Sequence, residues 1–151
     1  MNLSTRRQFL QASGFASLAA ARPTPLHAAE PLTLVKTKEL MQREPNTNPA
    51  GGKVWGLHRS ATSRTNLVEM RGEGVRHLHP DAEHSLYVIS GTVKATVGDE
   101  EFTLSAGDYI SIPAGVPHSY LAPVDVPALL ISMDAPPYDP QKTIRVKPAA
   151  K

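Results

Sequence analysis

The chain has 151 residues, contains no cysteine and carries a formal net charge of +2. This length suits one domain with a self-sufficient core, and no run of about eighteen apolar residues is present that would cross a membrane as a helix. The lack of cysteine excludes disulfides, thiolate metal ligands and a cysteine nucleophile.

The first segment, residues 1–29, has the features of an export signal. Its start, Ser4-Thr5-Arg6-Arg7-Gln8-Phe9-Leu10, resembles the twin-arginine export signature, and small apolar residues follow over 12–21. Cleavage is expected after Ala28 or Ala29. We therefore expect a twin-arginine signal peptide and a periplasmic mature domain, 30–151. The alternative is a chance Arg-Arg pair before an amphipathic N-terminal helix.

The charge of the mature part argues against a nucleic acid partner. Residues 1–29 hold three arginines and no acidic residue, which leaves thirteen lysines and arginines against fourteen aspartates and glutamates in 30–151. The mature domain is therefore near neutral, and it shows no basic stripe with interleaved aromatic residues. We expect no nucleic acid partner, and no membrane contact after signal removal.

From residue 30 onward, the sequence predicts strands and turns with hardly a helix. One or two helical turns are expected at 37–43. Short β-rich runs bounded by Gly, Pro, Asp or Ser are expected at 32–35, 54–57, 65–70, 75–79, 84–89, 92–97, 101–104, 109–112, 118–121 and 128–133, with a last edge strand at 143–147. Many short strands of this kind predict an all-β sandwich or barrel.

Three histidines are spaced so that strands bring their side chains together. His77 and His79 are two residues apart, and successive side chains of a strand point to opposite faces, so both imidazoles lie on one face. A turn at 80–82 leads to a further ligand on the next strand, and His118 follows far downstream. The pattern predicts a metal site built on strands.

Two segments together resemble the two motifs of the cupin superfamily. The first, 72–91, includes His77-Leu78-His79, and the second, 107–122, includes Pro113-Ala114-Gly115 and His118. The resemblance implies a single-domain jelly-roll β-barrel, 30–151, whose motifs place three histidines and usually one glutamate around a divalent metal. The resemblance also implies a homodimer. Separately, the strand-like ends 32–35 and 143–147 expose unpaired backbone groups that are able to pair with a partner chain.

The first motif departs from the family at its glutamate position. That position lies seven residues before the closing glycine, Gly91, and is His84 in this chain, whereas Glu83 is one residue early. One step along a strand turns a side chain to the other face, so only one of the two is able to face the metal without a bulge. Counting from Gly91 favours His84, as in the four-histidine subgroup of cupins. Glu83 stays as the alternative ligand.

The predicted ligand set accounts for four of the five histidines of the mature part. These ligands are His77, His79, His84 and His118. Imidazole suits manganese, iron, nickel, copper or zinc better than calcium or magnesium. Four protein ligands leave two positions of an octahedron open, where an anionic oxygen donor is expected to bind.

Two further side chains are expected to act beside the metal. Tyr120 lies two residues beyond His118 on the same strand face, so its hydroxyl is expected to reach the cavity, with core packing as the alternative. Glu83, where it is not a ligand, is expected to hydrogen-bond a ligand imidazole or to move a proton. We treat Tyr120 and Glu83 as the candidate catalytic residues.

These features favour one function over two alternatives. The leading hypothesis is a periplasmic, metal-dependent oxidoreductase, dioxygenase-like in type, that acts on a small organic anion or an enolisable substrate, because its nitrogen-rich site has open positions. The first alternative is a noncatalytic cupin that binds a metal and a ligand, since fold does not dictate activity. The second is a metal-dependent lyase or isomerase in which Tyr120 or Glu83 moves the proton.

Overall fold

The computed structural model describes residues 33–48 and 52–147, so the predicted export signal, 1–29, lies outside the described residues. A short helix, α1 (Thr37–Leu40), and a 3-10 turn, η1 (Pro140–Lys142), accompany the strands. The strands are β1 (Asn46–Thr47), β2 (Lys53–Arg59), β3 (Arg64–Met70), β4 (Gly72–Glu73), β5 (His77–Leu78), β6 (Glu83–Ser90), β7 (Thr92–Val97), β8 (Glu100–Ser105), β9 (Tyr109–Ile112), β10 (His118–Ala122), β11 (Ala128–Ala135) and β12 (Ile144–Arg145). No helix among these residues is long and apolar enough to cross a membrane.

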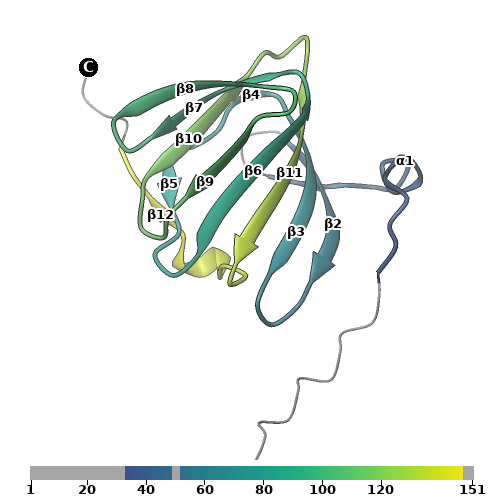
Figure 1. Ribbon diagram of the computed structural model, residues 1–151, viewed down its shortest axis with the longest axis horizontal. Helices are drawn as coiled ribbons and strands as arrows, with labels where there is room; N and C mark the ends of the chain where they lie inside the picture. Colours follow the sequence, from purple (N-terminus) through teal and green to yellow (C-terminus); the bar gives the residue numbers. More distant parts are fainter. Residues whose placement is uncertain (1–32, 49–51, 148–151) are drawn as a thin grey trace, which may run out of the picture. The chain divides into compact units, whose positions relative to one another are not determined.

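The strands form two antiparallel sheets that curve into a barrel (Figure 1). The first sheet has the order β1-β2-β3-β11-β6-β9, and the second has the order β12-β5-β10-β7-β8, with β4 paired to β10. Strands distant in sequence become neighbours, since β11 pairs with both β3 and β6. The prediction of an all-β barrel is confirmed.

The predicted strands agree with the structure except near the chain ends and in the shortest elements. Residues 33–35 are not a strand, and Leu34 is 84% exposed, so this run lacks the burial that would favour β structure. The expected strand at 75–79 is shortened to β5. The two-residue strands β1 and β4 were not predicted, because so few residues carry no alternation pattern.

The C-terminal strand corrects a further expectation about assembly. Ile144 is the Cα partner of Leu78, and Arg145 is the Cα partner of His77, so β12 pairs with β5 of its own chain. One edge of the predicted 143–147 strand is therefore used within the chain and is not free to pair with a partner there.

The inward-facing residues change from apolar to titratable along the barrel. On β6 the inward row runs from Val88 to Leu86 to His84, and on β11 it runs from Leu130 to Asp134. The two rows are in register, with Leu130 beside Val88 and Asp134 beside His84. Each fully buried leucine or valine stabilises the fold by about 1.5–3 kcal/mol. The apolar half of the barrel is therefore the core, and the other half carries the chemistry.

Candidate metal centre

The imidazoles of His77, His79 and His118 form a cluster at the polar end of the barrel. His77 and His118 are Cα partners on β5 and β10, and His79 follows His77 on the same side of the chain. The ring centroids are 4.9 Å apart for His77–His79, 4.6 Å for His77–His118 and 5.4 Å for His79–His118. One nitrogen of each ring lies within 4.8 Å of the other two, an arrangement that is able to hold a metal ion.

His84 joins this cluster from β6. Its ring centroid lies 5.2 Å from that of His118 and 5.6 Å from that of His79. With His79 and Asp134 it makes a second group of possible metal ligands, so the two groups share His79. The structure thus brings the four predicted histidines together and adds a carboxylate that the sequence interpretation missed.

Three of the four imidazoles use Nδ1 to donate a hydrogen bond to an oxygen that only accepts. These bonds run from His77 to the Val75 carbonyl at 2.7 Å, from His118 to the Val116 carbonyl at 2.9 Å and from His84 to Asp134 Oδ1 at 2.7 Å. A neutral ring with a proton on Nδ1 has its lone pair on Nε2, which is the form that binds metals. Nε2 of His118 is buried and has no hydrogen-bond partner among the residues that the structure describes. Such an unsatisfied acceptor costs about 1–3 kcal/mol, and a bound metal would satisfy it.

Burial keeps these rings neutral. Desolvation, with the neighbouring imidazoles, lowers the pKa of His79 to about 4 and that of His118 to about 3. Desolvation also lowers the pKa of His77. The hydrogen bond to the Val75 carbonyl acts in the opposite direction but does not outweigh it. At neutral pH the three rings therefore carry no proton that a metal ion would have to displace.

Asp134 fixes His84 and is itself held by Arg64. Oδ2 of Asp134 accepts hydrogen bonds from Arg64 Nε at 3.0 Å and Nη2 at 2.7 Å, and Oδ1 accepts from His84. Burial acts to raise the pKa of Asp134, but the hydrogen bonds and charges of His84 and Arg64 outweigh it and lower that pKa. The three residues are Cα partners on β3, β11 and β6, so they form one row across three strands. A carboxylate behind a ligand imidazole sets its tautomer and strengthens it as a donor.

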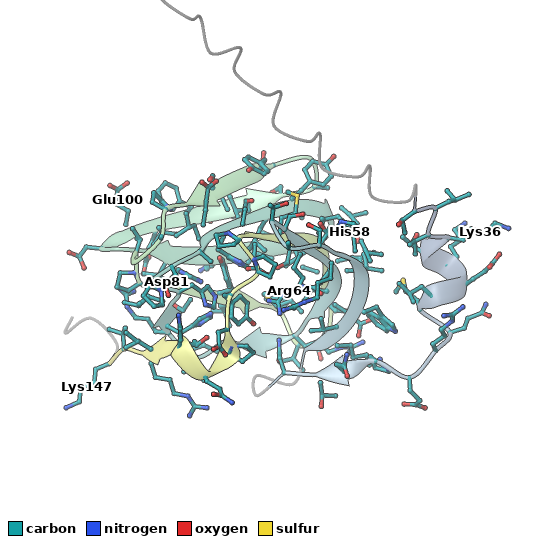
Figure 2. The ribbon with its side chains drawn as sticks, turned by 90° about the horizontal axis from the view of Figure 1, so that it is seen from below. Lys36, His58, Arg64, Asp81, Glu100 and Lys147 are labelled. Atoms are coloured by element: carbon teal, nitrogen blue, oxygen red, sulfur yellow. The ribbon has the colours of Figure 1, made fainter. Side chains whose placement is uncertain are left out.

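Tyr138 covers the cluster from the C-terminal side. Its ring stacks on His79 at a centroid distance of 4.0 Å and an interplanar angle of 21°. The guanidinium of Arg64 lies 4.1 Å from the centroid of the same ring. Figure 2 shows Arg64 within the ring of strands, in the view from below. Tyr138 therefore shields His79 and Arg64 from solvent.

A cavity of about 330 Å³ opens onto the cluster. Its lining includes His77, His79, Tyr120, Tyr138, Met70 and Arg145. The volume lies at the lower end of the range for small-molecule sites, about 300–1,000 Å³. The arrangement is thus suited to a small ligand that reaches the histidines.

Tyr120 lies where its strand position predicts. The side chain is 6% exposed, and its ring centroid is 5.6 Å from that of His118 and 6.1 Å from that of His84. The hydroxyl is buried, and no residue in the described part of the chain makes a hydrogen bond to it. Burial, with the charge of Asp134, raises the pKa of Tyr120 well above its usual value, so the hydroxyl keeps its proton.

The expectation that Glu83 contacts a ligand imidazole is wrong. Glu83 begins β6 on the face opposite to His84, where it is exposed, and its Oε1 accepts a hydrogen bond from Ser111 Oγ at 2.6 Å. The alternation of side chains along a strand turns its carboxylate away from the cluster. Neither a ligand role nor a catalytic role for Glu83 finds geometric support. Asp134 is the carboxylate at the cluster, and no local sequence signal pairs it with a histidine fifty residues away.

The described residues form an all-β barrel with a His/Asp cluster that is able to hold a metal ion, an arrangement consistent with a jelly-roll cupin. Residues 66–134 match the family model described as "Cupin domain". A similar solved structure is an RmlC-like cupin from Shewanella frigidimarina, with 25% identity, a TM-score of 0.58 and coverage of 64% of this chain and 86% of that chain. These findings support the cupin superfamily for this domain.

Two further comparisons concern enzymes. The chain is 43% identical over 44 residues to the quercetin 2,3-dioxygenase of Bacillus subtilis, a match that covers 29% of this chain and only 13% of that enzyme. It also resembles the structure of the nucleoside dehydratase Pac13 of Streptomyces, with 17% identity, a TM-score of 0.60 and coverage of 69% of this chain and 86% of that chain. At that identity the second likeness shows the fold alone.

Proposed function

We propose that the domain binds a divalent transition metal through His77, His79, His84 and His118 and acts as an oxidoreductase of the dioxygenase type. Its substrate is a small organic anion or an enolisable molecule. The observation that carries the proposal is the buried Nε2 of His118, which has no hydrogen-bond partner within 33–48 and 52–147 and has three other imidazoles around it. The short match to a quercetin 2,3-dioxygenase is consistent with this class of reaction.

The metal, when bound, supplies Lewis-acid and redox chemistry at its open positions. The protein groups supply orientation and exclusion of water. Nδ1 of His77, His84 and His118 is held by hydrogen bonds, so Nε2 of each ring is directed away from its anchoring oxygen. Tyr138 covers His79 and limits the access of water to the cluster.

Tyr120 is the group we assign to proton handling. Tyr120 lines the cavity, and its buried hydroxyl keeps its proton at neutral pH and has no hydrogen-bond partner within the described residues. It is therefore able to donate a hydrogen bond to a substrate oxygen, and to stabilise negative charge that develops there. The phenol does not need to be freed from an existing hydrogen bond first.

The test combines metal analysis with oxygen uptake. Elemental analysis of the purified protein is expected to find manganese, iron, nickel, copper or zinc near one ion per chain. The iron- or manganese-loaded protein is expected to consume oxygen with at least one member of a panel of diketones, flavonols and catechols, and a His118→Asn variant is the matched control. A loaded protein that consumes no oxygen across this panel contradicts the proposal.

The second candidate is a metal-dependent lyase or isomerase. The protonated, unpartnered hydroxyl of Tyr120 favours it, because such a group is suited to transfer a proton to a substrate. The structural likeness to a nucleoside dehydratase shows that the fold hosts elimination chemistry in another protein. Turnover under anaerobic conditions would support this candidate, whereas tight ligand retention without any turnover would support a noncatalytic binding protein.

Two further parts of the proposal concern location and assembly. A periplasmic location rests on the twin-arginine signature at Arg6-Arg7, and replacement of both by lysine is expected to leave the protein in the cytoplasm on cell fractionation.

A homodimer is supported by the outer face of β6 and β9, where the Cα partners Tyr87 and Tyr109 are 42% and 55% exposed. Light scattering on the purified protein tests the dimer, and a monomer mass contradicts it.

A further inference from the structure

One wall of the cavity comes from the C-terminal segment that lies along β5. Thr143 Oγ1 is 3.4 Å from His79 Nδ1, Arg145 is the Cα partner of His77, and the register continues with a bond from Val146 N to the Arg76 carbonyl at 3.0 Å. Directly opposite residues in a ladder place their side chains on the same face, about 4.5–5.5 Å apart at Cβ. The side chain of Arg145 therefore stands beside the imidazole of His77, and Arg145 lines the same cavity.

The guanidinium of Arg145 has no charge partner among residues 33–48 and 52–147. Within the described part of the chain it takes part in no ion pair and no side-chain hydrogen bond. Arg71, the other arginine of the cavity lining, is paired with Glu69 at 3.0 Å. The described residues that line the cavity include no aspartate or glutamate. Among the described residues, Arg145 is thus the arginine of this lining that has no acidic partner, and it lies beside the histidine cluster.

We propose that Arg145 binds the carboxylate of the substrate, so that the ligand class is a small carboxylate with a second oxygen donor. A guanidinium and a carboxylate form two parallel, charge-assisted hydrogen bonds, which give direction as well as affinity. With the carboxylate at Arg145, a neighbouring hydroxyl or carbonyl oxygen of the ligand faces His77 and the cluster. The ligands that fit are 2-hydroxy acids, 2-oxo acids and hydroxybenzoates. This inference deepens the proposed function and rests on its metal centre.

The lining gives the remaining part of the ligand an apolar environment. Met70 and Val75 lie on the cavity wall, and the ring of Tyr138 closes the side next to His79. A planar hydrocarbon skeleton is suited to such a surface, whereas a second charge on the ligand would find no partner there.

Salicylate and salicylamide test the proposal, because the two molecules share a ring and a hydroxyl and differ in the carboxylate. Titration calorimetry of each into the zinc-loaded full chain is expected to show salicylate binding at least tenfold more tightly. In Arg145→Met the two molecules are expected to bind with about equal affinity, and in Arg145→Lys the preference for salicylate is expected to be intermediate. Lys142→Met is the matched control, since Lys142 lies on the same segment, is paired with Asp81 and does not line the cavity.

Three results would overturn the inference: equal binding of both molecules to the wild type, no detectable binding of either, or an unchanged preference in Arg145→Met. The metal content and melting temperature of every variant are measured in parallel, and both are expected to match the wild type because Arg145 is exposed. The same titrations on metal-free protein are expected to show weaker binding with the same dependence on Arg145. Failure of oxygen uptake therefore contradicts the proposed reaction and leaves the result for Arg145 intact.

Discussion

Asp134 holds His84 from behind, with Oδ1 2.7 Å from Nδ1 of the imidazole and the two residues paired as Cα partners on adjacent strands. Arg64 holds the other oxygen of the same carboxylate from the next strand. Asp134 and Arg64 are almost removed from solvent, with side-chain exposures of 0% and 17%. The ring of His84 is thus positioned by a buried ion pair, and not only by packing.

Replacement of Asp134 by Asn is expected to weaken metal binding about 10–100-fold. A neutral amide orients the His84 imidazole less firmly than a carboxylate does, and it makes the ring a weaker electron donor. The protein is also expected to lose stability by about 3–5 kcal/mol, since Arg64 is left as an unpaired, largely buried charge. Competition with a chelating dye and chemical denaturation measure the two effects. The control is Asp81→Asn, whose exposed pair with Lys142 is worth about 0–1 kcal/mol. Metal affinity within about twofold of the wild type would contradict the role of Asp134.

Replacement of His84 and Glu83 separately by Ala distinguishes the two predicted ligands. His84 lies in the imidazole cluster, so its loss is expected to lower the metal content after dialysis at least tenfold. Glu83 is exposed and bonded to Ser111, so Glu83→Ala is expected to leave the metal content unchanged. Elemental analysis of both variants gives the answer, and the reverse result would restore Glu83 as the ligand.

Tyr120→Phe separates proton handling from core packing. If the hydroxyl acts on the substrate, turnover is expected to fall about 10²–10⁴-fold with the metal content unchanged. The stability is expected to stay the same or to rise by up to about 1 kcal/mol, since a buried hydroxyl without a partner is removed. Steady-state kinetics and thermal melting measure both quantities. Full activity in this variant would assign Tyr120 to the core alone.

The metal-free protein is expected to lose stability as the pH falls below about 6.5. Burial lowers the pKa of His79 to about 4 and that of His118 to about 3 from an ordinary value of 6.5, so the unfolded chain takes up protons at a higher pH than the folded chain. The free energy of unfolding therefore falls between pH 6.5 and about 3. The pKa of Asp134 is also lowered in the fold, so protonation of this carboxyl reduces the free energy of unfolding further at low pH. Denaturant titrations at pH 7.5, 6, 5 and 4 measure the slope.

A His118→Asn variant provides the control for this pH dependence. It removes the group with the lowest histidine pKa, so its stability is expected to change less with pH than that of the wild type. A wild-type free energy of unfolding that stays flat from pH 7.5 to 5 would contradict the prediction.

Gly91→Ala is expected to destabilise the fold by about 1–3 kcal/mol or more. Gly91 has φ +82°, and an added Cβ would lie 2.8 Å from the Cα of Ala128 and 3.0 Å from the Pro127 carbonyl. Gly98 also has a positive φ, +58°, but a Cβ there meets open space, so Gly98→Ala is the control for backbone strain alone. Thermal melting of both variants is the measurement, and an equal loss in the two would show that the close approach at Gly91 adds nothing.

Sequence alone determined those features that depend on local spacing. His77 and His79 are two positions apart, which places both on one strand face. His84 lies seven positions before Gly91, which distinguishes it from Glu83. The turns at Gly and Pro located most of the strands, because these residues act on the backbone of their immediate neighbours. The class of fold followed from the number and shortness of those strands.

Only the tertiary structure decided which distant side chains meet those histidines. Asp134 reaches His84 because β11 pairs with β6, Arg64 joins them because β3 pairs with the other edge of β11, and Arg145 reaches His77 because β12 returns to β5. Strand pairing joins residues that are fifty or more positions apart, and its register depends on burial in the whole barrel, which no local pattern encodes. The spacing of the candidate histidines His77, His79 and His84 is thus a local property of the chain, while the groups that hold them and the cation beside them are properties of the fold.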